Sequence, residues 1–183
     1  MNRIFKFITL SAAIFAFSFV NVSAQNFAPR SVSDKTIEQQ VYKKILQLPR
    51  YGVFDFINFT VENGTVTLDG KTISLGTRGE AASTVKRIPG VVNVINNIDE
   101  LPLSSLDREI RRHALWSFAS KGLGRYFHET RPDVRIVVEN GRITLEGFVY
   151  NTGDYNSLNI YAHGIPNVFS VQNNLIVGKD LRR

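Results

Sequence analysis

Apolar positions between residues 34 and 102 follow first a helical and then a strand periodicity. The helical positions recur every three or four residues and so share one face; they are Ile37, Val41, Ile45 and Leu48. Between Ile57 and Glu62, apolar and polar residues alternate, which is typical of a strand with one buried face. The pattern predicts an amphipathic helix followed by a strand that packs against it.

A hairpin and two further elements complete this first pattern. Asn63-Gly64 predicts a tight two-residue turn, because both residue types tolerate positive φ angles. Val66 and Leu68 then point inward from a second strand. We expect a second helix over residues 77–88 and a closing strand over residues 91–98.

The same order of elements occurs twice along the chain. Residues 61–70 (VENGTVTLDG) match residues 138–147 (VENGRITLEG), at an offset of 77 residues. The first helices begin near Asp34 and Asp107, at an offset of 73. Four extra residues therefore lie between the first helix and the first strand of the second copy. A constant offset from the hairpin onward indicates a tandem duplication.

The duplication predicts an α+β protein with two tandem αββαβ modules, residues 34–102 and 105–178. Each module should be a small three-stranded mixed sheet with two helices packed on one face. The second copy should repeat the helix, over residues 152–165, and the closing strand, over residues 168–177. Asp34 and Asp107 are expected as N-caps, because a short carboxylate accepts hydrogen bonds from the free N–H groups of the first turn.

The two ends of the chain are interpreted separately from the modules. Residues 1–24 are typical of a secretory signal peptide, with a basic start, a 13-residue apolar run and small residues before Gln25. This run is shorter than the roughly 20 residues of a spanning helix. We therefore expect a periplasmic protein, peripheral at the outer membrane, with no transmembrane segment after signal removal. Residues 25–33 are expected to be a flexible tether, and residues 179–183 a C-terminal tail.

Charge is distributed unevenly between the modules. The chain carries a formal net charge of +6; residues 34–102 hold eight basic and eight acidic side chains, and residues 103–183 hold eleven and eight. A basic second module favours an anionic surface, although solubility alone also accounts for such an excess. For an exported protein, that surface is lipid headgroup or cell-wall polymer rather than nucleic acid.

No catalytic, metal-binding or cofactor-binding pattern is evident. The chain contains no Cys, and His113, His128 and His163 lack the spacing of a helical metal site. Asp69 and Glu146 occupy the same strand position in the two copies, so the fold explains them better than an active site does. We expect a protein that is not an enzyme, with no catalytic residues, no metal and no cofactor.

The repeated residues resemble the BON domain. They are Asp-x-x-Ile at Asp34 and Asp107, the hairpin pattern of residues 61–70 and 138–147, and the closing-strand pattern that begins at Gly90. The resemblance covers residues 34–102 and 105–178. It implies an αββαβ fold, an envelope setting, and a role in binding phospholipid and maintaining the envelope under osmotic stress. The resemblance implies no catalysed reaction and no cofactor.

The first helix of the second module carries the candidate binding residues. If it continues unbroken past Gly122, one group of basic and apolar residues lies opposite the core positions Ile110, Ala114 and Phe118. That group is Arg108, Arg112, Leu115, Trp116 and Leu123, with Lys121 and Arg125 near the helix end. Trp and Arg side chains on an exposed helix face are typical of contact with a membrane interface.

The matching helix of the first module lacks this character, with Gln39 at the position of Arg112 and Lys43 at that of Trp116. Three interpretations of the difference remain: contact with anionic phospholipid, packing of Trp116 and Leu123 against the first module, and contact with an envelope protein. The leading hypothesis is a non-catalytic binder of anionic membrane surfaces. The alternative is a periplasmic protein-interaction or scaffolding module.

Overall fold

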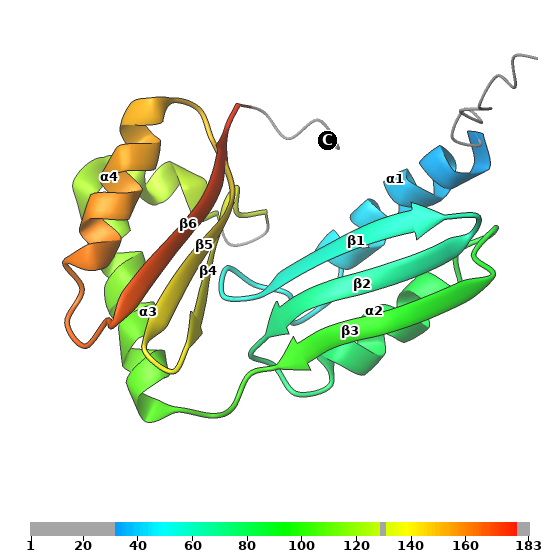
Figure 1. Cartoon of the computed structure of the whole chain (residues 1–183), viewed down its shortest axis with the longest axis horizontal. Helices are drawn as coiled ribbons and strands as arrows, with labels where there is room; N and C mark the ends of the chain where they lie inside the picture. The colour runs from blue at the N-terminus through cyan, green and yellow to red at the C-terminus, as the bar shows by residue number, and fades with distance from the viewer. Residues whose placement is uncertain (1–31, 129–130, 179–183) are drawn as a thin grey trace, which may run out of the picture.

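The computed structural model describes residues 32–128 and 131–178, which form two αββαβ modules (Figure 1). The elements of the first module are α1 (Val32–Leu46), β1 (Phe56–Glu62), β2 (Thr65–Thr72), α2 (Thr77–Lys86) and β3 (Asn93–Glu100). Those of the second are α3 (Ser105–Phe118), η1 (Ala119–Leu123), η2 (Gly124–Tyr126), β4 (Val134–Glu139), β5 (Arg142–Val149), α4 (Thr152–His163) and β6 (Ser170–Val177).

The two sheets have the same topology. Strand order is β1-β2-β3 in the first module and β4-β5-β6 in the second. The first two strands of each sheet pair antiparallel, and the third pairs parallel to the second. The predicted α+β fold with two three-stranded mixed sheets is therefore confirmed. The four extra residues of the second copy fall in the segment that contains η1 and η2.

Each module has its own hydrophobic core between the sheet and its helices. The first core contains the predicted helix positions Ile37, Val41 and Ile45 together with inward strand residues such as Val66 and Leu68. The second core is built in the same way. Its buried members include Ile110, Ala114, Phe118, Ile136, Ile143, Leu145, Leu158 and Leu175. The sequence periodicity therefore identified the buried face of most elements.

The two Asn-Gly turns adopt the predicted positive-φ conformation. Asn63 and Gly64 have φ angles of 51° and 75°, and Asn140 and Gly141 have 51° and 74°. Positive φ at both central residues defines the type I′ turn, whose twist matches that of the paired strands. The duplicated turn is therefore a structural feature of the fold.

The predicted N-cap role of Asp34 and Asp107 is wrong. Ser104 caps α3, because its side chain accepts a hydrogen bond from the Asp107 N–H at 3.1 Å. Asp107 lies inside the first turn of the helix, and its carboxylate accepts the N–H groups of Asn140 and Gly141 at 2.9 and 2.8 Å. A carboxylate from the helix thus fastens the hairpin turn.

Asp34 makes the equivalent contact in the first module. It also lies in the first helical turn, and its carboxylate accepts the N–H groups of Asn63 and Gly64, both at 3.0 Å. Asp34 and Asp107 are 5% and 1% exposed. The repeated aspartate therefore ties the first helix of each module to a turn about 30 residues away.

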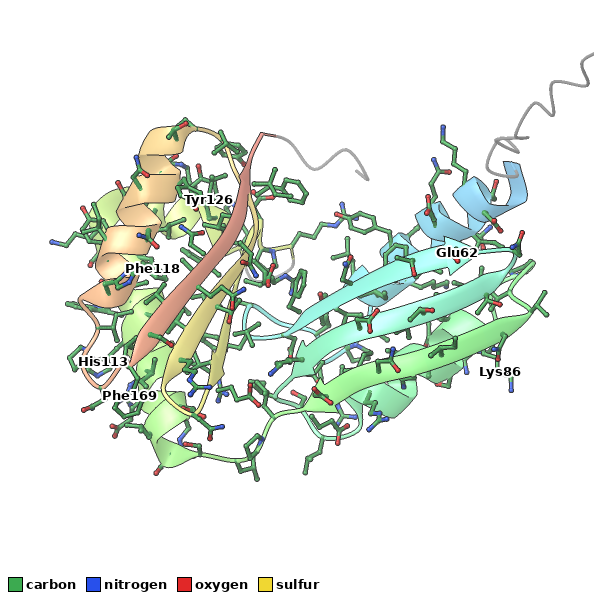
Figure 2. All side chains as sticks on the ribbon, viewed as in Figure 1. Glu62, Lys86, His113, Phe118, Tyr126 and Phe169 are labelled. Atoms are coloured by element: carbon green, nitrogen blue, oxygen red, sulfur yellow. The ribbon has the colours of Figure 1, made fainter. Side chains whose placement is uncertain are left out.

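A loop of the first module joins the two modules. The Val53 carbonyl accepts the N–H of Ile136 at 2.8 Å, which extends hydrogen bonding beyond the edge strand β4. The Arg135 guanidinium donates to the Gly52 carbonyl at 2.5 Å and lies 4.2 Å from the centroid of the Tyr51 ring. Glu62 and Lys86 lie at the end of the first module that points away from the second module (Figure 2). The loop lies at the opposite end, next to the second module.

The burial of β4 shows the effect of this contact. All residues from Val134 to Val138 are buried, whereas the residues of β1 alternate between buried and more exposed. Side chains of a strand alternate between two faces, so both faces of β4 are covered. One is covered by the core of the second module, and the first-module loop contributes to covering the other.

The predicted terminal segments lie mostly outside the described residues. The signal peptide over residues 1–24 and the tail over residues 179–183 lie entirely outside them. The predicted tether over residues 25–33 overlaps α1, which already includes Val32. Within residues 32–128 and 131–178, no helix combines the length and the apolar character that crossing a membrane requires.

One core position distinguishes the two copies and leads to a stability prediction. Thr72 is fully buried and its Oγ1 atom has no hydrogen-bond partner among residues 32–128 and 131–178, whereas the matching Val149 is fully buried and apolar. An unpaired buried hydroxyl is destabilising. Thr72→Val should therefore raise the free energy of unfolding by about 1 kcal/mol, measured by urea denaturation. The reverse change, Val149→Thr, should lower it, and a destabilised Thr72→Val variant would contradict this account.

Candidate functional site

The helix α3 presents a polar and aromatic surface to solvent. Arg108 and Arg112 are exposed, Trp116 is 73% exposed, and Leu115 is half-buried. These four residues, which we call the α3 surface, share one side of the helix, because Arg112 lies four positions after Arg108 and three to four before Leu115 and Trp116. Trp116 does not pack against the first module, so the packing interpretation fails for this residue.

The α3 surface forms one side of a groove between the modules. The groove has a volume of about 910 Å³. Its lining combines residues of α3 and the preceding linker with two residues of the first module. They are Leu103, Ser104, Ser105, Arg108, Arg111, Arg112, Leu115, Trp116 and Ala119, together with Phe54 and Ile73. We call this feature the inter-module groove.

A buried arginine contributes to the wall of this groove. Arg111 is 7% exposed and donates from Nη2 to the Val138 carbonyl at 2.6 Å, while its Nε atom has no partner within the described residues. Burial lowers the pKa of Arg111, and the carboxylates of Asp107 and Asp55 oppose that effect. An arginine nevertheless stays protonated in proteins. Arg111 therefore places a positive charge behind the groove surface.

Asp55 compensates part of that charge. It is 1% exposed and accepts the N–H groups of Gly52 and Ile73, both at 2.8 Å. Burial raises the pKa of Asp55 above its ordinary value, although these hydrogen bonds and the nearby Arg135 and Arg111 act in the opposite direction. Asp55 thus links the loop of the first module to the electrostatics of the second.

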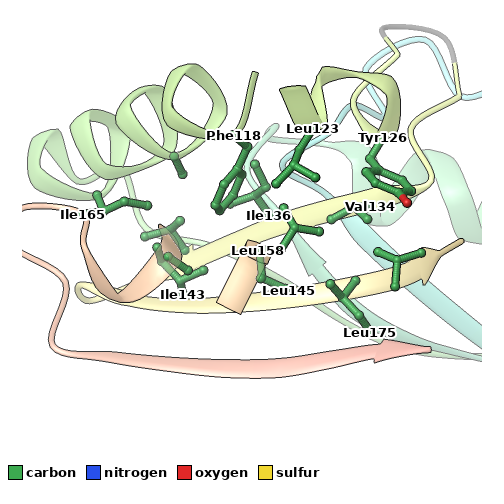
Figure 3. Close-up of a cluster of buried hydrophobic side chains, with 14 of the residues drawn as sticks. Phe118, Leu123, Tyr126, Val134, Ile136, Ile143, Leu145, Leu158, Ile165 and Leu175 are labelled. Carbon is green, nitrogen blue, oxygen red and sulfur yellow. The ribbon is translucent and has the colours of Figure 1, made fainter. Parts of the chain in front are cut away.

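Leu123 does not belong to the predicted surface. The regular helix ends at Phe118, and Gly122 in the following turn has a φ angle of 80°. This turn changes the direction of the chain, so the helical projection no longer applies. Leu123 is 4% exposed and points into the core of the second module near Phe118 and Tyr126 (Figure 3).

Lys121 and Arg125 also lie apart from the groove lining. The Lys121 ammonium is 5.8 Å from the centroid of the Tyr161 ring. Arg125 donates to the Asp154 carboxylate at 2.6 Å and to the Gly122 carbonyl at 2.8 Å. Both side chains are therefore engaged with the second module itself. Of the seven predicted residues, the structure brings together Arg108, Arg112, Leu115 and Trp116.

Asp154 holds the segment after α3 in place. Its carboxylate accepts hydrogen bonds from Arg125, from the Tyr126 hydroxyl at 2.5 Å and from Asn151 at 2.8 Å. Burial acts to raise the pKa of Asp154, but these hydrogen bonds outweigh it and hold the pKa below the ordinary value. The predicted binding residue Arg125 thus has a structural role.

Sequence reasoning missed three kinds of groove residue. Leu103, Ser104 and Ser105 lie in the linker and the first turn, where no periodicity marks a surface. Phe54 and Ile73 come from the other module, and their place depends on how the modules pack. The burial of Arg111 could have been predicted, because a helical projection puts it about 100° from Ile110, on the same side as the buried Phe118.

The groove offers cationic and aromatic groups rather than a metal centre. In the parts of the chain that the structure describes, no group of three or more His, Cys, Asp or Glu side chains is arranged to hold a metal ion. Arginine guanidinium groups instead suit phosphate and carboxylate, which they bind through planar paired donors. The arrangement can therefore bind an anionic group beside an apolar one.

Comparison with known families identifies the class of this tandem αββαβ protein. The model of the BON domain matches residues 33–102 and 106–179. The chain therefore belongs to the BON-domain family, with one domain in each module. The predicted resemblance is confirmed.

Two solved structures show weak similarity. Both are of CdsD, a structural protein of the type III secretion system of Chlamydia trachomatis, one of them its C-terminal domain. The C-terminal domain is 13% identical with a TM-score of 0.33, and the match covers 76% of this chain and 96% of that one. The other is 12% identical with a TM-score of 0.31, covering 76% and 91%. No curated protein matches the chain.

Proposed function

We propose that this protein is a non-catalytic, exported envelope protein that binds anionic phospholipid surfaces through the α3 surface of its second module. The observation that carries the proposal is the exposure of Trp116, at 73%, on the same side of α3 as Arg108 and Arg112. Its setting would be the periplasm, peripheral to the outer membrane, and its role the maintenance of the envelope under osmotic stress.

The chemistry of the α3 surface supports this proposal. An indole ring is amphipathic and is favoured at the boundary between headgroups and acyl chains. Arginine side chains near an anionic membrane contribute roughly 1 kcal/mol each through attraction to lipid headgroups. Both kinds of group lie on one helix, so they can reach the same membrane plane together. Residues 103–183 also carry the excess of basic side chains.

Vesicle binding tests the proposal. Trp116→Ala and Arg112→Glu should each weaken binding to phosphatidylglycerol vesicles by about tenfold, because each removes a contact worth roughly 1–2 kcal/mol. Co-sedimentation measures the affinity, and the blue shift of Trp116, the only tryptophan, reports insertion in the wild type. Zwitterionic vesicles should give little binding.

The duplication supplies matched controls. Gln39 and Lys43 are exposed and occupy the positions of Arg112 and Trp116 in the first module. Gln39→Glu and Lys43→Ala should leave vesicle affinity within about twofold of wild type, because those residues lie outside the proposed contact. Equal binding by wild type, Trp116→Ala and Arg112→Glu would refute the proposal. Absence of any vesicle binding would favour the alternative of an envelope protein partner, sought by crosslinking.

A further inference from the structure

We propose that the inter-module groove holds one lysophospholipid molecule, with its phosphate-bearing head at the N-terminal end of α3 and its single acyl chain toward Ala119. The inference rests on the proposed function, because it assigns a ligand to the side of the α3 surface that faces the first module. It adds a second mode of binding, in which a monomeric lipid is enclosed between the modules instead of being touched in a bilayer.

The N-terminal end of the groove carries serine and arginine side chains beside the exposed Leu103 of the linker. Ser104, Ser105 and Arg108 line this end, where α3 begins. The first turn of a helix carries the positive end of the helix dipole, and in α3 the Ser104 side chain already accepts the Asp107 N–H. Arg108 and Arg112 form no ion pair among the pairs observed in the described residues. Their guanidinium groups are thus available to a phosphate.

The opposite end of the groove is apolar. Leu115, Trp116 and Ala119 line it at the C-terminal end of α3, and Phe54 and Ile73 contribute apolar side chains of the first module to the same groove. From Ser105 to Ala119 the helical rise corresponds to about 20 Å. The lining thus changes from cationic to apolar along one helix, in the order of the head and chain of an amphiphile.

The dimensions of the inter-module groove favour a ligand with one acyl chain. The volume of about 910 Å³ is at the upper end of the range of roughly 300–1,000 Å³ that is typical of small-molecule sites. A single helix bounds one side and Phe54 and Ile73 the other, which leaves one apolar path beside α3. A lysophospholipid has one acyl chain and fits this arrangement better than a diacyl lipid does.

Arg111 provides an independent observation at the same place. Its side chain lines the groove although it is 93% buried, and its Nε donor is unpartnered within the described residues. The neighbouring carboxylates of Asp107 and Asp55 are occupied by backbone N–H groups. A phosphate beside Arg108 and Arg112 would therefore also lie near the Arg111 guanidinium, whose charge Asp107 and Asp55 offset in part.

The test is a calorimetric titration of the mature protein with lysophosphatidylglycerol held below its critical micelle concentration. Wild type should saturate at one ligand per chain. Ala119→Phe, which places a ring in the apolar end, should weaken this binding at least tenfold and leave vesicle affinity unchanged. Ser120→Phe adds the same ring to the adjacent exposed residue, outside the groove lining, and should bind like wild type. Arg108→Gln should weaken binding about tenfold.

Three results would overturn the inference. They are the absence of saturable binding, equal binding by Ala119→Phe and wild type, and equal binding of a neutral monoacylglycerol of the same chain length. Failure of the two proposals is distinguishable. Vesicle binding without lysophospholipid binding overturns the groove site alone, and stoichiometric lysophospholipid binding without vesicle binding supports it while refuting the proposed membrane contact.

Discussion

Gly70→Ala is expected to lower the free energy of unfolding of the first module by about 4 kcal/mol, because added strain and overpacking act together. Gly70 has a φ angle of 143° in β2, opposite Ile57 of β1. A Cβ atom at this position would lie 2.0 Å from the Phe56 carbonyl oxygen and 2.9 Å from the Ile57 Cα. Backbone atoms on a paired strand cannot move aside without breaking the ladder.

Urea denaturation followed by circular dichroism measures this effect. The duplicated Gly147 offers a replicate, since a Cβ there would lie 2.1 Å from the Asp133 carbonyl oxygen at a φ angle of 117°. Gly79 offers the control: it lies in α2, and nothing is within 4 Å of a Cβ at that position. Gly79→Ala should be neutral or stabilising by up to about 1 kcal/mol. A Gly70→Ala variant as stable as wild type would show that the two strands can separate locally at little cost.

Asp107→Ala is expected to destabilise the second module by about 3 kcal/mol. Its carboxylate accepts the N–H groups of Asn140 and Gly141, and buried donors left without a partner cost roughly 1–3 kcal/mol each. The variant also removes one of the two carboxylates that offset the positive charge of the buried Arg111. The hairpin turn, which α3 no longer fastens, should exchange its amide hydrogens faster.

The measurement combines urea denaturation with hydrogen exchange at Asn140 and Gly141. Asp107→Asn keeps one acceptor oxygen and should lose less stability than Asp107→Ala. Glu109→Ala, on the exposed side of the same helix, should stay within about 0.5 kcal/mol of wild type. Equal stability of Asp107→Ala and Glu109→Ala would show that the hairpin turn folds without the carboxylate.

Local patterns were reliable for the elements of this protein. The periodicity of Ile37, Val41 and Ile45 identified the buried side of α1 because a helix repeats its faces every three to four residues. The Asn-Gly turns were predictable because few residue types accept positive φ at both central positions. The duplication identified both modules, since two matching segments at one offset are difficult to explain otherwise.

Side-chain roles that depend on distant residues were not predictable in this way. Asp107 has the sequence position of a helix-start residue, yet its acceptors are directed at a turn more than 30 residues along the chain. Leu123 lies on the predicted surface only if the helix continues, and the backbone at Gly122 ends that regularity. In both cases the role of the side chain depends on backbone geometry or on distant residues, which the periodicity of a short sequence segment does not contain.

The sequence by itself therefore determined the two αββαβ modules, their turns, their cores and the polar and aromatic character of α3. These features follow from contacts among neighbours in the chain and from the division between buried and exposed faces. Only the tertiary structure decided that Phe54 and Ile73 face α3 across a groove and that Arg111 is buried beside Asp55. Those relations depend on the packing of one module against the other, which no local pattern of apolar and polar residues specifies.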